Sequence, residues 1–187
     1  MISESLATRT ADFLRKFPPY SYIPREDLRS WAGKVNMRYY AENEFIFQEG
    51  EMNQGWVFIL DKGRVELSKD FGFETRLIDV CDTGDTFGVR SVLGGEAYCS
   101  TDIVSEEALV YLFPAQDFKN LLSKYPKVAM YFASGLAAGM SVIREQGKKL
   151  NQARIELGVG NKFSPLFREE DVIVQRHQDK VAFIKID

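Results

Sequence analysis

The chain has 187 residues, of which 45% are hydrophobic and 27% are charged, and its formal net charge is −3. This balance is typical of a folded globular protein and excludes a disordered or fibrous chain. The slight excess of acidic residues also argues against a nucleic-acid partner, because nucleic-acid-binding domains usually carry a basic stripe.

Two cysteines, Cys81 and Cys99, and a single histidine, His177, restrict the chemistry of the chain. Two cysteines in a chain of this length do not make a disulfide scaffold, and a structural zinc site needs more ligands than these. A Ser-His-Asp triad would have to use His177 in the C-terminal tail, and the sequence has no GxSxG stretch. We therefore expect no metal site, no catalytic residues and no enzymatic activity.

The N-terminal stretch MISESLATRTADFLRKF has no apolar segment of signal-peptide length. No run in the sequence approaches the ~18 apolar residues needed to span a bilayer. We expect a cytoplasmic protein without a membrane partner.

Residues 1–33 are predicted to form an N-terminal helical segment. In its first helix, predicted over residues 3–17, side chains recur at helical spacing at Leu6, Thr10, Phe13, Leu14 and Phe17. Pro18 and Pro19 end this helix, because the residue before a proline avoids the helical conformation. Pro24 opens a second short helix, PREDLRSWAG, which ends at Gly33.

Residues 34–114 are predicted to form antiparallel β-structure, because short β-rich runs alternate with turn residues about every eight to twelve positions. The runs are VNMRYY, EFIFQEG, GWVFILDKG, GRVELSKD, TRLIDVCDTG, TFGV, CSTDIVSE and ALVYLFP. The tripeptide Asp61-Lys62-Gly63 is predicted to be a hairpin turn between the third run and the fourth.

Residues 115–157 are predicted to be helical, with a short helix, AQDFKNLLSKY, and a long one that starts at Pro126. An apolar stripe runs along the long helix through Val128, Phe132, Leu136, Met140, Ile143 and Leu150. The helix either lies on its own β-structure or pairs with the same helix of a second copy. A single small barrel cannot cover so long a helix, which favours a homodimer. Residues 158–187 form a tail that is either a β-hairpin or the opening of a further domain.

Three stretches resemble the cyclic nucleotide-binding domain family: FIFQEGEMNQGWVFILDKGRVEL (45–67), GDTFG (84–88) and ALVYLFPAQDFKNLL (108–122). The order of helix, β-roll, short helix and long helix is also similar to that family. The resemblance implies an α+β fold, with an eight-stranded antiparallel β-roll of the double-stranded β-helix or jelly-roll type between N-terminal helices and a long C-terminal helix. It implies a regulatory role in signal transduction, with cAMP or cGMP as the ligand.

A narrower resemblance is carried by FLRKFPPYSYIPREDL and FGVRSVLGGEAYCSTDIVSEEALVYLFP. These stretches are similar to bacterial signalling proteins in which the domain precedes a pair of CBS domains and a nucleotidyltransferase-type domain. That resemblance implies a downstream signalling domain in the same chain, which the tail would approach.

The stretch GDTFGVRSVLGGEAYCST (84–101) corresponds to the segment that holds the phosphate in this family. There, the phosphate rests on backbone N–H groups at the start of a short helix, a glutamate binds the ribose hydroxyl, and an arginine about nine residues later pairs with the phosphate. In this sequence Val89 stands at the glutamate position, and the arginine position falls on Tyr98 or, after a shift of one residue, on Cys99. Both charged groups are therefore replaced.

Other groups of the same stretch could still hold an anion. The backbone part of the site, from Phe87 and Gly88 to Ser91, looks retained, and Ser100 and Thr101 offer hydroxyl groups. Arg90 either replaces the missing arginine or pairs with an acid such as Glu96, whose charge would repel a phosphate. We predict a degenerate phosphate cassette with weak or no binding of cAMP and cGMP.

Two alternative functions remain from the sequence. One is a ligand-free module that keeps the fold for dimerisation and for holding a downstream domain. The other is a DNA-binding regulator of the catabolite-activator kind, which would need a winged helix-turn-helix after the long helix. The last thirty or so residues show no recognition-helix pattern, so this alternative is less favoured.

Overall fold

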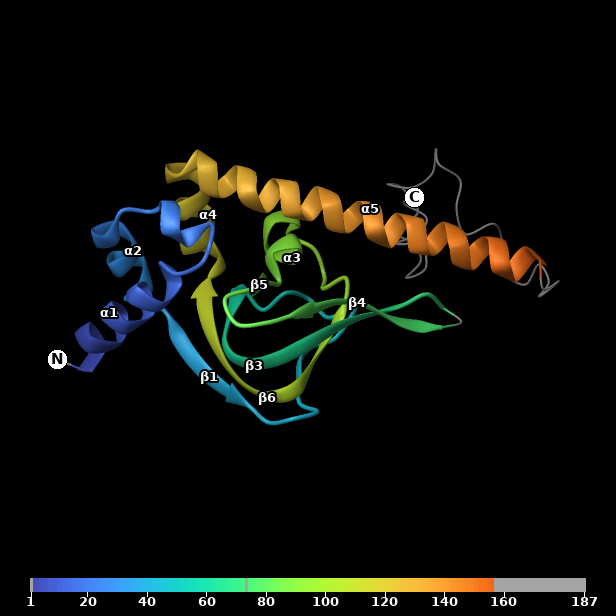
Figure 1. Ribbon diagram of the computed structural model, residues 1–187, viewed down its shortest axis with the longest axis horizontal. Helices are drawn as coiled ribbons and strands as arrows, with labels where there is room; N and C mark the ends of the chain where they lie inside the picture. Colours follow the sequence, from blue (N-terminus) through green and yellow to red (C-terminus); the bar gives the residue numbers. More distant parts are fainter. Residues whose placement is uncertain (1, 73, 157–187) are drawn as a thin grey trace.

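The computed structural model describes residues 2–72 and 74–156 (Figure 1). The N-terminal helices are α1 (Ile2–Leu14), a 3-10 turn η1 (Tyr20–Tyr22) and α2 (Arg25–Ala32). Helix α1 ends three residues before the predicted boundary, because the N–H groups of Lys16 and Phe17 bond carbonyls only three residues back. Helix α2 begins directly after Pro24, as predicted, and carries two acids in its first turn, where they complement the helix dipole. Both predicted helices are therefore present, and the division at residue 33 stays a prediction.

The β-structure is one antiparallel sheet. Its strands are β1 (Asn36–Tyr40), β2 (Phe45–Phe47), β3 (Trp56–Asp70), β4 (Thr75–Cys81), β5 (Thr86–Phe87) and β6 (Thr101–Pro114). They follow the order β1-β6-β3-β4, with β2 paired to β6 and β5 paired to β3. The described residues thus hold six strands where eight were predicted, because two pairs of predicted strands are continuous in β3 and β6. The jelly-roll type of the sheet stays a prediction.

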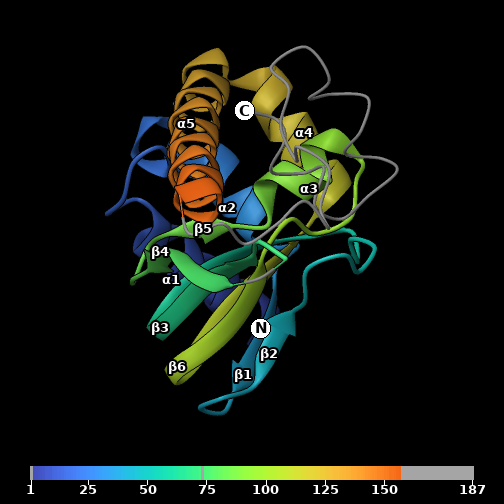
Figure 2. The same cartoon turned by 90° about the vertical axis from the view of Figure 1, so that its right-hand side faces the viewer.

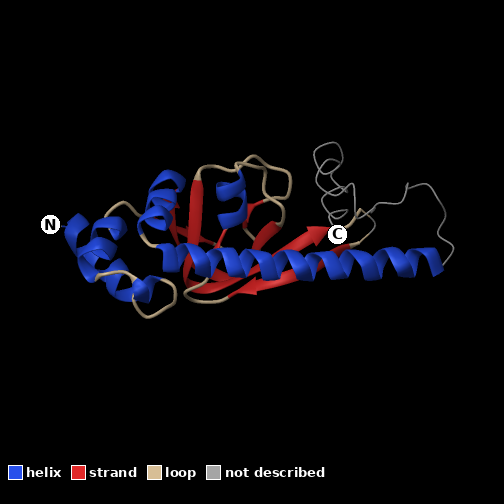
Figure 3. Ribbon diagram, turned by 90° about the horizontal axis from the view of Figure 1, so that it is seen from above, coloured by secondary structure: helices blue, strands red, loops and turns tan. Residues whose placement is uncertain are grey.

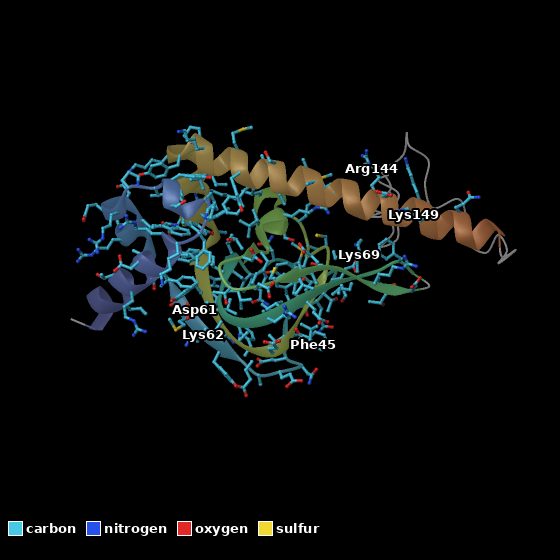
Figure 4. All side chains as sticks on the ribbon, in the orientation of Figure 1. Phe45, Asp61, Lys62, Lys69, Arg144 and Lys149 are labelled. Carbon is cyan, nitrogen blue, oxygen red and sulfur yellow. The ribbon has the colours of Figure 1, made fainter. Side chains whose placement is uncertain are left out.

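The predicted hairpin turn at Asp61-Lys62-Gly63 is wrong. These residues lie inside β3, which pairs with β6 on both sides of them, and the register shifts three times between Leu60 and Val65. Gly63 has a φ of 92°, and a Cβ there would lie 2.2 Å from the carbonyl oxygen of Glu107. The tripeptide is therefore an irregular bend that curves one long strand without ending it, and Asp61 and Lys62 are labelled on this bend in Figure 4.

Three helices follow the order in the sequence: α3 (Val89–Gly94), α4 (Ala115–Lys124) and α5 (Pro126–Glu156). Helix α5 runs along the length of the domain and continues past the sheet (Figure 3). Of its predicted apolar stripe, Val128 and Phe132 are buried in the domain's own core, and Leu136 packs partly against it. At these residues the helix packs on its own domain, which is the alternative that the sequence left open beside the homodimer. Ile143 and Leu150 lie outside the residues whose side chains the structure describes, and so does the tail over 158–187.

Two apolar clusters support the sheet on opposite sides. The first joins the N-terminal helices to β6 and to the start of α4 and α5, and in it the rings of Trp31 and Phe113 stack with centroids 3.7 Å apart. The second fills the inside of the roll around Phe47, Phe58 and Val104. The β5–α3 segment contributes to both clusters, with Phe87 in the second and Val89 and Val92 in the first. Each large apolar side chain contributes about 1.5–3 kcal/mol when fully buried, so this packing fixes the position of the segment.

Among the described helices, none is long and apolar enough to cross a membrane.

Candidate functional site

A cavity of about 550 Å³ lies beneath α5. Its walls are formed by β4, by the segment from Gly84 to Ser91 and by Tyr98 to Ser100, and residues of α5 from Tyr131 to Met140 close it. Seen end-on in Figure 2, α5 lies over β5 and β4 with α3 beside it. The volume is within the range of sites for small organic ligands. Much of the predicted phosphate cassette therefore lines this cavity, which is the candidate site.

The start of the cassette has the backbone geometry that the sequence predicts. Gly88 is the N-cap of α3, with a φ of 73°, and a Cβ there would lie 2.9 Å from the ring of Phe58. Gly88, Arg90 and Ser91 all line the cavity, and the first N–H groups of a helix lack acceptors within that helix. The hydroxyl of Ser91 is already used, because it donates to the carbonyl oxygen of Ala97 at 3.1 Å. The backbone of this turn and the side chain of Arg90 therefore stay as the candidate anion-binding groups of the turn.

The glutamate and arginine positions are both built into the apolar interior. Val89 is buried in the cluster that packs on the N-terminal helices. Tyr98 is 2% exposed, and its ring stacks on that of Phe47 with centroids 3.7 Å apart and an interplanar angle of 9°. Its hydroxyl accepts a hydrogen bond from the backbone N–H of Gln54 at 3.2 Å, and burial raises the pKa of that phenol. Neither position offers a charge to a phosphate.

The alternative arginine position, Cys99, supplies its carbonyl oxygen to a buried ion pair. The ammonium of Lys69 donates to that oxygen at 2.9 Å and to the carboxylate of Glu49 at 2.5 Å. The side chain of Lys69 is fully buried, and burial lowers its pKa although Glu49 acts against this. The pKa of the Cys99 thiol is raised, because the effect of burial exceeds the opposite effect of the positive charges of Arg90 and Lys69. Both cysteines are free thiols; Cys81 is buried and Cys99 is partly buried.

The remaining predicted residues separate into two groups. Arg90, Phe87 and Ser100 line the cavity, whereas Thr101 and Glu96 are not among its lining residues. The hydroxyl of Thr101 instead accepts a hydrogen bond from the backbone N–H of Glu49 at 3.1 Å. Arg90 is therefore placed where it could meet an anion, and Glu96 is not part of the wall.

Asp102 is the residue of the cavity that sequence reasoning missed. It is completely buried, lines the cavity from β6, and accepts a hydrogen bond from the Ser100 hydroxyl at 2.7 Å through Oδ1. Burial is the main cause that raises its pKa to about 8. The signal was the alternation along β6, which places Asp102 on the same face as the buried Val104.

The acidic side chains of the turn between β4 and β5 make contacts within the protein. Asp85 accepts a hydrogen bond from the backbone N–H of Asp82 at 2.9 Å, and Asp82 pairs with Arg64 at 3.2 Å. Within the part of the chain that the structure describes, no group of His, Cys, Asp and Glu side chains could hold a metal ion.

Comparison with known proteins identifies this architecture. Residues 37–125 match the family described as "Cyclic nucleotide-binding domain". This part of the chain is therefore similar to a cyclic nucleotide-binding domain. A stretch of 87 residues is 29% identical to the cGMP-dependent protein kinase egl-4 of Caenorhabditis elegans. This stretch makes up 46% of the present chain and 11% of the kinase.

Solved structures share the fold of this chain. The cAMP-bound PfPKA-R (141–441) has a TM-score of 0.70 at 22% identity, over 78% of this chain and 49% of that one. The guanosine-bound regulatory subunit of a cAMP-independent protein kinase A from Trypanosoma cruzi has a TM-score of 0.61 at 17% identity, over 73% of this chain and 51% of that one. This chain therefore spans about half or less of the length of these relatives.

Proposed function

We propose that this protein is a regulatory sensor whose cyclic nucleotide-binding domain has lost the charged half of its phosphate cassette and binds cAMP and cGMP weakly or not at all. The stacking of Tyr98 on Phe47 carries the proposal, because it fills the arginine position with a buried aromatic ring. Val89 supports it, because its buried side chain accepts no hydrogen bond from a ribose.

The expected loss of affinity follows from the missing partners. A hydrogen bond to a charged group contributes about 1.5–3 kcal/mol. Two such losses weaken binding by roughly two to four orders of magnitude, because about 1.4 kcal/mol corresponds to a factor of ten. Arg90 lines the cavity and could recover part of this loss by meeting the phosphate. A relative bound to guanosine supports the idea that this fold can hold a ligand without a phosphate.

Calorimetric titration of the protein with cAMP and with cGMP tests the proposal. We expect no micromolar binding to the wild-type protein. The double variant Val89→Glu with Tyr98→Arg restores both charged groups and is expected to bind cAMP at least about tenfold more tightly than the wild type. Its folding is checked by circular dichroism, since it also removes the Tyr98 ring. Micromolar binding of either nucleotide to the wild type would overturn the proposal.

A second candidate function is dimerisation without a ligand, coupled to a downstream domain. Helix α5 favours it, because the helix continues past the sheet. It also exposes the small residues Ala133, Ala137 and Ala138, which are not among the residues that line the cavity. Close approach of a second helix backbone suits such small side chains. Sedimentation equilibrium is expected to give a dimer, and a monomer at the highest protein concentration would contradict it. We further infer a cytoplasmic, non-enzymatic role, as expected for a regulatory domain.

A further inference from the structure

The turn that follows β2 is hydrogen-bonded to the end of the cassette. The N–H of Gly50 donates to the carbonyl oxygen of Tyr98 at 2.9 Å, and the N–H of Tyr98 donates to the carbonyl oxygen of Glu51 at 2.8 Å. The side-chain amide of Asn53 donates to the carbonyl oxygen of Glu96 at 3.0 Å. All of these partners belong to the protein, so this part of the cassette is held by bonds that need no ligand.

Lys69 connects this turn and the cassette to β3. Its ammonium group donates to the carboxylate of Glu49 at 2.5 Å and to the carbonyl oxygen of Cys99 at 2.9 Å. The other carboxylate oxygen of Glu49 accepts the backbone N–H of Asp70 at 3.0 Å, and the backbone N–H of Glu49 donates to the Thr101 hydroxyl at 3.1 Å. One buried ion pair therefore joins three segments, which are β3, the turn after β2 and the end of the cassette.

The ion pair is costly to break, because the side chain of Lys69 is fully buried. Removal of one partner leaves the other as a buried charge without compensation. Cys99 and Ser100 line the cavity, whereas Lys69 and Glu49 are not among its described lining residues. Lys69 can therefore act on the cavity only through the cassette residues that it holds in place.

We propose that Lys69 is a positioning residue which, paired with Glu49, keeps the end of the cassette in place without a ligand. The inference rests on the proposed function, because a cassette with Tyr98 and Cys99 at its candidate arginine positions cannot use a phosphate to hold this segment. In place of a positive charge that bonds a ligand, the chain has one that bonds the cassette itself. The order of the site then depends on an ion pair inside the protein and not on the concentration of a cyclic nucleotide.

The test measures how fast N-ethylmaleimide labels Cys99 in the whole chain without any nucleotide, and mass spectrometry identifies the labelled peptides. Lys69→Met is expected to speed this labelling at least about tenfold, because the released segment opens more often. Loss of the charge alone acts in the other direction. The positive charge of Lys69 lowers the pKa of the Cys99 thiol, so its removal leaves less of the reactive thiolate. A faster rate therefore reports lost positioning.

Arg76→Met is the matched control, because it removes a cation of the neighbouring strand β4 whose pair with Glu74 is exposed. It is expected to change the labelling rate of Cys99 less than about twofold. Cys81 is the internal reference, since it is buried in the core of the roll and its labelling reports wider unfolding. Equal acceleration at both cysteines would show a global effect and overturn the inference. A folded Lys69→Met variant whose Cys99 is labelled no faster than in the wild type would overturn it too.

A measurement on the wild type covers the case in which Lys69→Met does not fold. Without nucleotide, the backbone N–H groups of Gly50 and Tyr98 are expected to exchange with solvent at least about a hundredfold more slowly than in an unfolded chain. Exchange as fast as in an unfolded chain would contradict the inference. None of these measurements uses a nucleotide, so they are independent of the proposed function, which fails if cAMP or cGMP binds at micromolar concentration.

Discussion

Tyr98 and Phe47 form an aromatic stack, with ring centroids 3.7 Å apart, between the end of the cassette and strand β2. Phe47 lies in the core of the roll, so the stack packs the end of the cassette against this core. The resemblance to the family predicts that its phosphate-binding arginine corresponds to Tyr98 or, after a shift of one residue, to Cys99. In this structure the Tyr98 side chain makes a packing contact and offers no positive charge to the cavity.

The stack predicts that Tyr98 now contributes to stability. Tyr98→Ala removes a buried ring and is expected to lower the free energy of unfolding by about 3–5 kcal/mol. Tyr98→Phe keeps the stack but leaves the Gln54 N–H without its acceptor, at a cost of about 1 kcal/mol. Urea denaturation measures both. Tyr22→Ala, at a ring that is 53% exposed, is the control and is expected to change stability by no more than about 0.5 kcal/mol. Equal effects of the two alanine variants would contradict the packing role.

Gly63 predicts a second stability effect, at the bend of β3. Gly63→Ala would place a Cβ 2.2 Å from the Glu107 carbonyl oxygen at a φ of 92°, and we expect a loss of about 3 kcal/mol or more. Gly55 is the matched control, because it also has a positive φ of 77° but no atom within 4 Å of an added Cβ. Gly55→Ala is expected to cost about 1 kcal/mol from its backbone conformation alone. If both variants lose the same stability, the clash is not what matters at Gly63.

Most of the fold could be predicted from the sequence, because local signals and the family resemblance agreed. Pro24 and Pro126 start helices where proline is expected, and the β-rich runs became strands. The strand count could not be predicted, since Asp61-Lys62-Gly63 satisfies the rules of a hairpin turn. What decides between a turn and a bend is the pairing of both halves of β3 with β6. This long-range pairing cannot be predicted from the tripeptide itself.

The site could be predicted in position but only partly in chemistry. The family resemblance predicts that the charged residues of the cassette are replaced at Val89 and at Tyr98 or Cys99. Two contacts join segments that are far apart in the sequence: the stack of Tyr98 on Phe47 and the buried pair of Lys69 with Glu49. No local sequence pattern predicts such contacts. The stripe on α5 gave a homodimer as the favoured interpretation, yet Val128 and Phe132 cover the domain's own core. Periodicity identifies an apolar face but not what covers it.

Lys69, labelled in Figure 4, predicts a large effect from a buried ion pair. Lys69→Met leaves the carboxylate of Glu49 without its cation, and removal of one partner of a buried pair is expected to cost about 3–5 kcal/mol. The exposed pair of Arg76 with Glu74, at 3.0 Å, is the control, and Arg76→Met is expected to cost less than about 1 kcal/mol. The double variant Lys69→Met with Glu49→Gln should lose less than the sum of its single changes. Strict additivity in urea denaturation would show that the two residues are not coupled.

Asp102 predicts how stability changes with pH. Burial, and then the charge of Asp79, raise its pKa to about 8 in the folded protein, whereas the unfolded chain releases this proton near its ordinary value of about 3.9. The other titratable groups that interact with it are Cys81, Tyr98 and Cys99. Because the folded state binds more protons than the unfolded state between these two values, the free energy of unfolding falls as the pH rises from about 4 to 8.

Asp102→Asn cannot ionise and therefore separates this effect from the other titrating groups. The stability of the wild type relative to this variant is expected to fall by more than about 1 kcal/mol between pH 5 and pH 8, since one pKa unit corresponds to 1.36 kcal/mol. Urea midpoints of both proteins at the two pH values give the difference directly. The same comparison with Asp82→Asn, whose side chain is exposed, is expected to be flat. If the wild type and Asp102→Asn stay equally far apart at both pH values, Asp102 is ionised throughout, and its Oδ2 can then only accept a hydrogen bond.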